Sequence, residues 1–202
     1  MVEDAYRTAG GEVRHEPPKV KGSRFIASVG LAGTMEAAEA FREGIRHEFP
    51  DATHNCFAYR IAARVFRSGD DGEPSGSAGR PILQQIESRD LVRTVVVVTR
   101  YFGGTKLGVG GLVRAYGGAA SEALEMAGVR EVPITRRVRV RHPYERSGEV
   151  QSVLAALGLA PAASEFGEDV ILVFDVPLRT VDPLSRELAE RTAGQVRAEV
   201  LD

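Results

Sequence analysis

The amino-acid sequence predicts an α+β protein of two domains with a boundary near Pro133. Before this point, strand-like and helix-like segments alternate around LVRTVVVVT at residues 91–99, a β-branched run typical of a strand buried on both faces. After it the pattern restarts, with the order strand, helix, strand, strand, helix, strand, which is the ferredoxin-like split motif. We therefore expect a first domain over residues 1–133 and a ferredoxin-like βαββαβ domain over residues 134–202.

The elements of the first domain follow from hydrophobic spacing and from helix-end signals. Thr34 is an expected helix N-cap, and apolar residues then recur at helical spacing until Pro50. Pro81 suits the first turn of a short helix, and Gly128 is an expected C-terminal stop for a longer one. The expected strands are residues 23–31, 54–62 and 91–99, and the long helix is residues 111–127.

The second domain carries a row of arginines on its first strand. We expect strands at residues 136–144, 159–166, 169–176 and 195–201, and helices at residues 145–157 and 181–191. Strand alternation places Arg137, Arg139 and Arg141 on one sheet face, and Arg197 joins them there. An uncovered basic sheet face is a common RNA-binding platform, but this one lacks aromatic residues. A solvated face whose charges pair across strands is therefore the favoured interpretation.

Bulk composition narrows the functional classes. The net charge is -2, so binding of nucleic acid would require a local basic patch. Cys56 is the single cysteine, which allows no intrachain disulfide and fits a reducing cytosol. The first residues lack the apolar core of a signal peptide, and the longest apolar stretch is far too short for a membrane span. We expect a cytoplasmic protein with no membrane partner.

The first candidate site is the acidic loop at residues 68–81, SGDDGEPSGSAGRP. Such a loop can offer carboxylates to a hard cation such as Mg²⁺, or backbone N–H groups to an anion. The competing interpretation is an ordinary surface turn, since Asp, Gly, Pro and Ser are all turn formers. The candidate residues are Asp70, Asp71, Glu73, Ser75, Ser77 and Arg80.

The second candidate site is the glycine-rich loop at residues 100–114, RYFGGTKLGVGGLVR. It follows a buried strand and opens a helix, where helix N-terminal amides and glycine backbone can receive phosphate. Its basic residues add positive charge, and its aromatic pair offers a stacking surface for a base. The alternative is that the glycines only permit tight packing. The candidate residues are Arg100, Tyr101, Phe102, Gly103, Gly104, Lys106, Gly108, Gly110, Gly111 and Arg114.

The sequence gives little support for a standard nucleotide-binding motif, a catalytic nucleophile or a metal site. The glycine-rich loop matches neither the Walker A pattern nor the dinucleotide fingerprint. His54 and Cys56 share a strand face but sit too far apart for a direct hydrogen bond, so no nucleophilic pair is expected. The remaining histidines show no metal-ligand spacing. The sequence therefore specifies no cofactor, and Mg²⁺ at the acidic loop is the one candidate.

Several runs together carry a family resemblance. They are KGSRFI at residues 21–26, DATHNC at 51–56, DDGEPSGSAGRP at 70–81 and TRYFGGTKLGVGGLVRAYG at 99–117. These runs closely resemble the IMPACT/YigZ family, with Ser77 standing where threonine is usual. The resemblance implies a first domain with the βαβ sandwich fold shared by a ribosomal small-subunit protein domain, translocase domain IV and certain small-molecule kinases. It implies a second domain like the last domain of the translocating elongation factor.

The resemblance points towards RNA or the ribosome, although the activity of bacterial members is unsettled. Eukaryotic members restrain a starvation-sensing kinase, and they require an additional N-terminal interaction module to do so. We do not expect room for that module in this sequence, so the resemblance does not imply the same role here. Our leading hypothesis is a translation-associated protein, not an enzyme, that binds RNA or a ribonucleoprotein through the two loops. The rival is an enzyme that binds a nucleotide or phosphorylated metabolite, and a third alternative is a protein-interaction regulator. We expect Asp70, Asp71 and Glu73 to lie close to residues 100–114 and to form one cleft with them.

Overall fold

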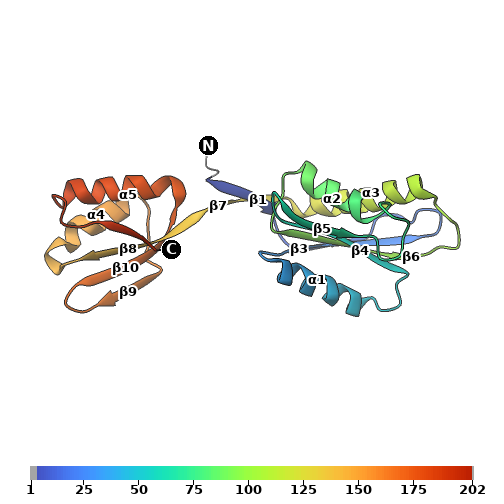
Figure 1. The fold of residues 1–202 in the computed structure, drawn as a ribbon, viewed down its shortest axis with the longest axis horizontal. Coiled ribbons are helices and arrows are strands. Elements are labelled where there is room, and N and C mark those ends of the chain that lie inside the picture. The colour runs from blue at the N-terminus through green and yellow to red at the C-terminus, as the bar shows by residue number, and fades with distance from the viewer. Residues whose placement is uncertain (1–3, 202) are drawn as a thin grey trace. The chain divides into compact units, whose positions relative to one another are not determined.

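The computed structural model describes residues 4–201, so the expectation about the first three residues lies outside it. The described residues divide into two compact units (Figure 1). One unit is Tyr6–Val132, and the other contains residues 133–201 together with Asp4 and Ala5. No helix within residues 4–201 is long and apolar enough to cross a membrane.

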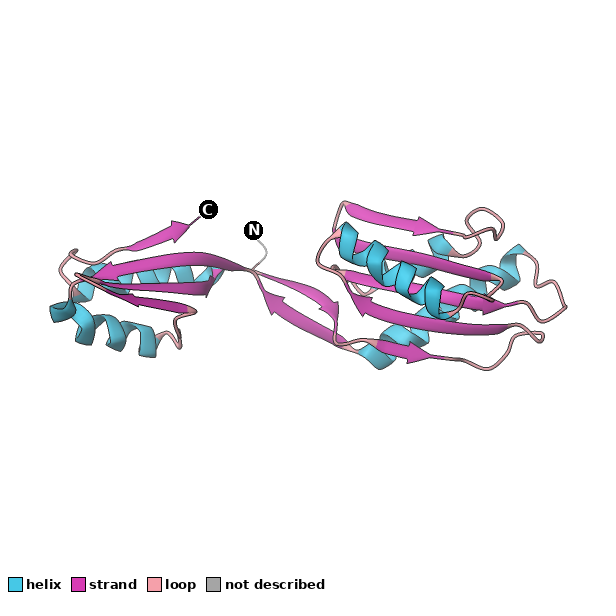
Figure 2. Cartoon of the chain, turned by 90° about the horizontal axis from the view of Figure 1, so that it is seen from below, coloured by secondary structure: helices cyan, strands magenta, loops and turns pink. Residues whose placement is uncertain are grey.

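The first unit is a three-layer structure around an antiparallel five-stranded sheet. The strand order is β2 (Val13–His15), β3 (Arg24–Leu31), β6 (Thr94–Tyr101), β4 (His54–Ala62) and β5 (Val65–Gly69). Helices α2 (Gly79–Ser88) and α3 (Val109–Ala127) cover one face (Figure 1). Helix α1 (Met35–Glu48) covers the other face and lies in front of the strands in Figure 2.

The central strand β6 explains why this sheet needs a cover on both faces. Val96 and Val98 pack into the core beneath α2 and α3, and Val95 and Val97 pack into the core beneath α1. All four are fully buried, which confirms the expectation drawn from the valine run. Burying each such side chain contributes about 1.5–3 kcal/mol.

The helix ends follow the sequence signals. Thr34 caps α1, because its hydroxyl accepts a hydrogen bond from the Ala37 N–H at 3.2 Å. Gly128 ends α3 with a positive φ of 67°, the conformation that glycine adopts without steric cost. Both expectations are confirmed.

The sequence did not predict four short strands in this part of the chain. They are β1 (Ala5–Ala9), β2, β5 and β7 (Val129–Pro133). Strand β5 occupies the start of the expected acidic loop, and it is exposed apart from Gly69. Strands β1 and β7 pair with each other as a two-stranded sheet. Their residues are mostly polar or solvent-facing, so pairing with another strand, rather than a hydrophobic pattern, defines them: β1 and β7 pair across the chain, whereas β2 and β5 pair with the neighbouring strands β3 and β4.

The second unit has the ferredoxin-like arrangement that the element order predicts. Its antiparallel sheet has the order β11 (Ala198–Leu201), β8 (Thr135–His142), β10 (Val170–Pro177) and β9 (Ala163–Phe166). Helices α4 (Ser147–Ala156) and α5 (Leu178–Arg191) cover one face, and a 3₁₀ turn at Tyr144–Arg146 precedes α4. Alternate residues of β8, including Val138 and Val140, are buried beneath these helices.

Because each unit encloses its own apolar cluster, we propose that the two units are independent folding domains. Leu188 is fully buried in the second unit, so Leu188→Ala should remove about 2–5 kcal/mol from the unfolding free energy of that unit alone. Amide hydrogen exchange would measure the two units separately. Leu83→Ala is the matched change in the first unit. An equal loss of protection in both units after either change would contradict independent folding.

Candidate nucleic-acid interface

The acidic and glycine-rich loops meet at a buried ion pair. Arg100 Nη1 donates to Glu73 Oε1 at 2.6 Å, and the two side chains are only 5% and 4% exposed. The hydroxyl of Tyr116, on α3, donates to the same carboxylate oxygen at 2.7 Å. The expectation that the two loops lie together is therefore confirmed. Their contact is an enclosed ion pair and not an open cleft.

Arg100 also fastens a third segment to this junction. Its Nη2 donates to Ser23 Oγ at 3.2 Å, and that oxygen accepts a second hydrogen bond from the Gly103 N–H at 3.2 Å. Gly22 and Gly103 allow the two backbones to approach closely, because a Cβ on Gly103 would lie 1.9 Å from the Gly22 carbonyl carbon. Arg100, which we had expected to meet phosphate, is therefore enclosed and serves to join three segments.

Asp70 caps the N-terminus of α2 from within the protein. Its carboxylate accepts backbone N–H groups from Gly76 at 2.8 Å, Ala78 at 3.0 Å and Gly79 at 2.8 Å. Burial opposes ionisation, but these hydrogen bonds outweigh it and lower the pKa of Asp70 below its usual value. The positive end of the α2 dipole is thus already matched by an internal carboxylate.

The other members of the acidic loop also have internal partners. The Asn55 N–H donates to Asp71 Oδ2 at 2.6 Å, and the buried Ser77 hydroxyl donates to the Pro74 carbonyl at 2.6 Å. Ser75 and Arg80 are exposed. In residues 4–201, no group of three or more His, Cys, Asp or Glu side chains is arranged to hold a metal ion. These carboxylates organise the loop by accepting backbone N–H groups.

The N-terminus of α3 differs from that of α2. Its N-cap is Gly108, its first turn contains no acidic residue, and no side chain in residues 4–201 caps it. Pro81 packs near Gly117, and Arg89 donates to Ser121 at 2.8 Å, so the two helices begin at the same end of the sheet. The first amides of α3 have no carbonyl one turn earlier within the helix. This helix end can therefore receive an anion from outside the protein.

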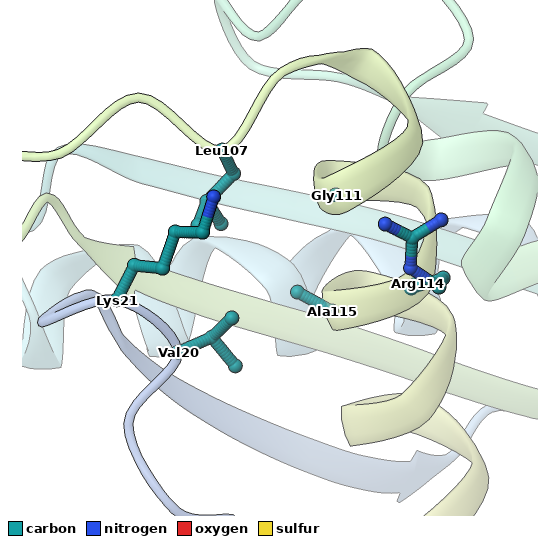
Figure 3. Close-up of a pocket in the computed structure, with 6 residues that line it drawn as sticks. All are labelled: Val20, Lys21, Leu107, Gly111, Arg114 and Ala115. Carbon is teal, nitrogen blue, oxygen red and sulfur yellow. The ribbon is translucent and has the colours of Figure 1, made fainter.

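Basic side chains surround this helix end. Lys21, Lys106 and Arg114 are exposed, and none has an ion-pair partner in the described part of the chain. Lys21 and Arg114 line an open pocket of about 220 Å³ with Val20, Leu107, Gly111 and Ala115 (Figure 3). We call Lys21, Phe102, Lys106, Gly110 and Arg114 the α3 surface.

Lys21 was not among the residues that sequence reasoning selected. It is more than 75 positions from the glycine-rich loop, and only the tertiary structure brings it beside α3. The signal that could have found it is the KGS run at residues 21–23, where the adjacent glycine and serine make the contacts with Gly103. Tyr116 was also missed as the second donor to Glu73, because it lies in a stretch of α3 that has the composition of an ordinary core helix.

The two aromatic residues of the glycine-rich loop have different environments. Tyr101 donates its hydroxyl to Asp51 at 2.9 Å, and the Arg24 guanidinium lies 5.5 Å from its ring centre. Phe102 is 47% exposed, although the Arg100 guanidinium lies 5.5 Å from its ring centre. Phe102 is therefore the more available stacking surface for a base.

Two buried groups near the ion pair are poor nucleophiles. Cys56 is fully buried and its thiol donates to the Asp70 carbonyl at 3.0 Å. Burial raises the pKa of the Cys56 thiol and the pKa of the Tyr116 hydroxyl well above their usual values. Both therefore stay protonated, and the thiolate that catalysis would require does not form at neutral pH.

The arginine face of the second unit is largely paired. Arg139 binds Glu199 at 2.7 Å and Arg141 binds Asp169 at 2.7 Å. Arg137 stands opposite Asp175 in the β8–β10 register, and Arg197 is exposed immediately before β11. Cross-strand pairing of this kind is what the solvated-face interpretation predicts.

Comparison with known proteins gives matches for both units. The family model of the Impact N-terminal domain matches residues 21–124, and a domain of unknown function, DUF1949, matches residues 140–195. An IMPACT family member of Thermus thermophilus is 41% identical over 89% of this chain and 99% of its own length. YigZ of Escherichia coli, described as an IMPACT family member, is 34% identical over 89% of this chain and 90% of its own length. A crystal structure of a hypothetical protein aligns with a TM-score of 0.72 at 30% identity, covering 100% of this chain and 99% of that one.

The Asp70 cap predicts a pH-dependent contribution to stability. The pKa of Asp70 is lower in the folded protein than the unfolded value of about 3.9, so its carboxylate stabilises the fold above that pH. This contribution is lost as pH falls through the folded-state pKa. Asp70→Asn should lower the unfolding free energy by about 0.5–2 kcal/mol at neutral pH, as measured by urea denaturation, and the difference should shrink in acid.

Asp90→Asn is the matched control, since Asp90 is 71% exposed and only forms a surface ion pair with Arg60. Its effect at neutral pH should stay below that of Asp70→Asn. An Asp70→Asn effect that is constant from neutral to acidic pH would contradict the capping role.

Proposed function

The chain belongs to the IMPACT family, and we propose that it binds RNA, free or within a ribonucleoprotein, through the α3 surface. The observation that carries this proposal is that, among residues 4–201, no side chain caps the N-terminus of α3 and the three exposed cations beside it have no ion-pair partner. Oriented amides and exposed cations together favour phosphate. The net charge of -2 makes this local arrangement, rather than an overall attraction, the source of affinity.

Three features favour a polymer over a small phosphorylated metabolite. The pocket beside Lys21 and Arg114 is open and small, at about 220 Å³, whereas small-ligand sites usually enclose about 300–1,000 Å³. Phe102 supplies an exposed ring on the same loop as Lys106, and single-stranded RNA sites combine such rings with basic residues. Cys56 and Tyr116 are held in their neutral forms, so these two groups supply no nucleophile for an enzymatic site.

The internal contacts of the two loops support the proposed RNA site, because they use some charged groups within the fold and leave others exposed to a ligand. Arg100 and the acidic loop satisfy each other, and Asp70 satisfies α2. These groups hold the glycine-rich loop in place, while Lys106 and Arg114 stay exposed. We propose a role in translation for this binding and a cytoplasmic location, which the single buried cysteine suits.

The double change Lys106→Ala with Arg114→Ala should weaken binding of a single-stranded RNA irrespective of its sequence. Each lost phosphate contact should flatten the slope of log affinity against log salt by about 0.7. Fluorescence anisotropy with labelled oligonucleotides at several salt concentrations would measure both effects. Arg139→Ala with Arg141→Ala is the matched control on the second unit. A larger loss from the control than from the α3 changes would contradict the proposed site.

Phe102→Ala should weaken single-stranded RNA by about 1–3 kcal/mol, because one base loses its stacking partner. Duplex RNA should be affected less, since its bases are already stacked, and Tyr101→Ala should cost less than Phe102→Ala. The same anisotropy assay would measure all three. If no RNA binds at low salt but a mononucleotide raises the melting temperature, the metabolite-binding rival replaces this proposal.

A further inference from the structure

The second unit contains a largely apolar pocket that the proposed RNA site does not use. Its volume is about 430 Å³, within the range of ligand-binding sites. Helix α4 contributes Leu154 and Ala155 to its wall, and the strands contribute Leu172 and Phe166. Two of its lining rings face solvent: Tyr144 is 51% exposed and Phe166 is 70% exposed. Exposed aromatic rings beside an apolar hollow are typical of a binding surface.

Sheet register explains how this pocket forms. Phe166 stands opposite Val170 and Ser164 stands opposite Leu172, so the two β9 side chains project towards the helix-covered face of the sheet. Val170 and Leu172 are buried in the core, whereas β9 is exposed throughout. Helix α4 therefore covers β10 but leaves β9 open, and the hollow lies between them.

His142 provides a polar group inside this apolar lining. Its side chain lines the pocket, and the residue is only 2% exposed. Its Nδ1 lies 2.9 Å from the Pro143 carbonyl, which can only accept a hydrogen bond, so in the neutral imidazole Nδ1 carries the proton and Nε2 is an acceptor. Within residues 4–201, Nε2 has no hydrogen-bond partner, and this atom is not completely shielded from solvent. A ligand that donates a hydrogen bond would satisfy it.

Two further features describe the rest of the ligand. Strand β9 is an edge of the sheet, so one side of its backbone has no strand partner within residues 4–201 and can pair with an added strand. Glu145 and Glu168 flank the lining residues in sequence and are exposed, and neither has an ion-pair partner among the residues that the structure describes. This acidic border favours a basic ligand.

We propose that this pocket and the β9 edge bind an extended, basic peptide segment of a partner protein. The segment pairs with β9 and places a tryptophan or tyrosine side chain in the pocket, where its N–H or O–H donates to His142 Nε2. The ring packs against the apolar wall, and lysine or arginine residues beside it face the glutamates. The proposal is independent of RNA binding, since it uses none of the α3 surface.

The absence of tryptophan from this chain makes a direct test available. The probe is the peptide Ac-Lys-Val-Trp-Val-Lys-NH2, titrated with the full chain and followed by its own fluorescence. We expect saturable binding with a blue-shifted emission that weakens as salt is raised. Replacing tryptophan by 1-methyltryptophan removes only the N–H donor and should weaken binding about three- to ten-fold. Replacing both valines by proline should weaken it at least about ten-fold, because proline cannot donate to a strand.

A matched pair of variants locates the site. Ala155 and Ala156 are both exposed on α4, but only Ala155 lines the pocket. Ala155→Phe should therefore weaken the peptide at least about ten-fold, and Ala156→Phe should leave its affinity unchanged, with equal melting temperatures for the two variants. No saturable binding, or no effect of Ala155→Phe, would overturn the proposal. Equal affinity for the proline peptide or for free N-acetyltryptophanamide would overturn the peptide assignment and make this a small-molecule pocket.

Discussion

The buried ion pair between Arg100 and Glu73 holds together the loops on which the proposed RNA site is built. Both side chains are almost fully buried and have lost most of their contact with water. Each charge is therefore stabilised mainly by the other. Removing either partner would leave an unpaired buried charge, which costs about 3–5 kcal/mol. The pair adds little net stability compared with apolar side chains, but it determines how the acidic loop, α3 and the glycine-rich loop fit together.

The surroundings of the pair show how its position is maintained. Tyr116 donates to Glu73 from α3, and Ser23 accepts from both Arg100 and Gly103. One Arg100 nitrogen, Nε, lies buried without a partner, so the site is not optimised for stability alone. Phe25 and Phe102 pack against the guanidinium from different segments. Phe102 is thereby supported on its inner side while almost half of it is exposed.

The two units differ in what their exposed charges can do. In the first unit the Asp70 carboxylate already occupies the anion-binding end of α2, and no carboxylate of the described residues occupies the start of α3. In the second unit the arginines of β8 are matched by Glu199 and Asp169, which lowers their availability to phosphate. The second unit instead has an apolar hollow bordered by glutamates that have no ion-pair partner among the described residues. The two surfaces therefore suit ligands of opposite charge.

The sequence by itself determined the long elements, because their signals are local. The valine run of β6, the Thr34 cap and the Gly128 stop each act within a few residues, and the βαββαβ order specified the second unit. Only tertiary structure decided β1 and β7, since each is paired with a strand more than 100 residues away, and β2 and β5 are short strands with no buried residue that are defined by pairing with β3 and β4 rather than by a hydrophobic pattern.

The same distinction applies to the candidate site. The sequence identified the two loops and their contact by charge and glycine content, but it could not say which charges would be used internally. Arg100 and Asp70 look like ligand-binding residues in a one-dimensional sequence, and they become structural residues once Glu73 and the α2 amides lie against them. Lys21 became part of the site for the converse reason, because the Gly22–Gly103 approach brings its segment beside α3. Burial and long-range contact decide whether a charge serves the fold or a ligand, and neither is a local property of the sequence.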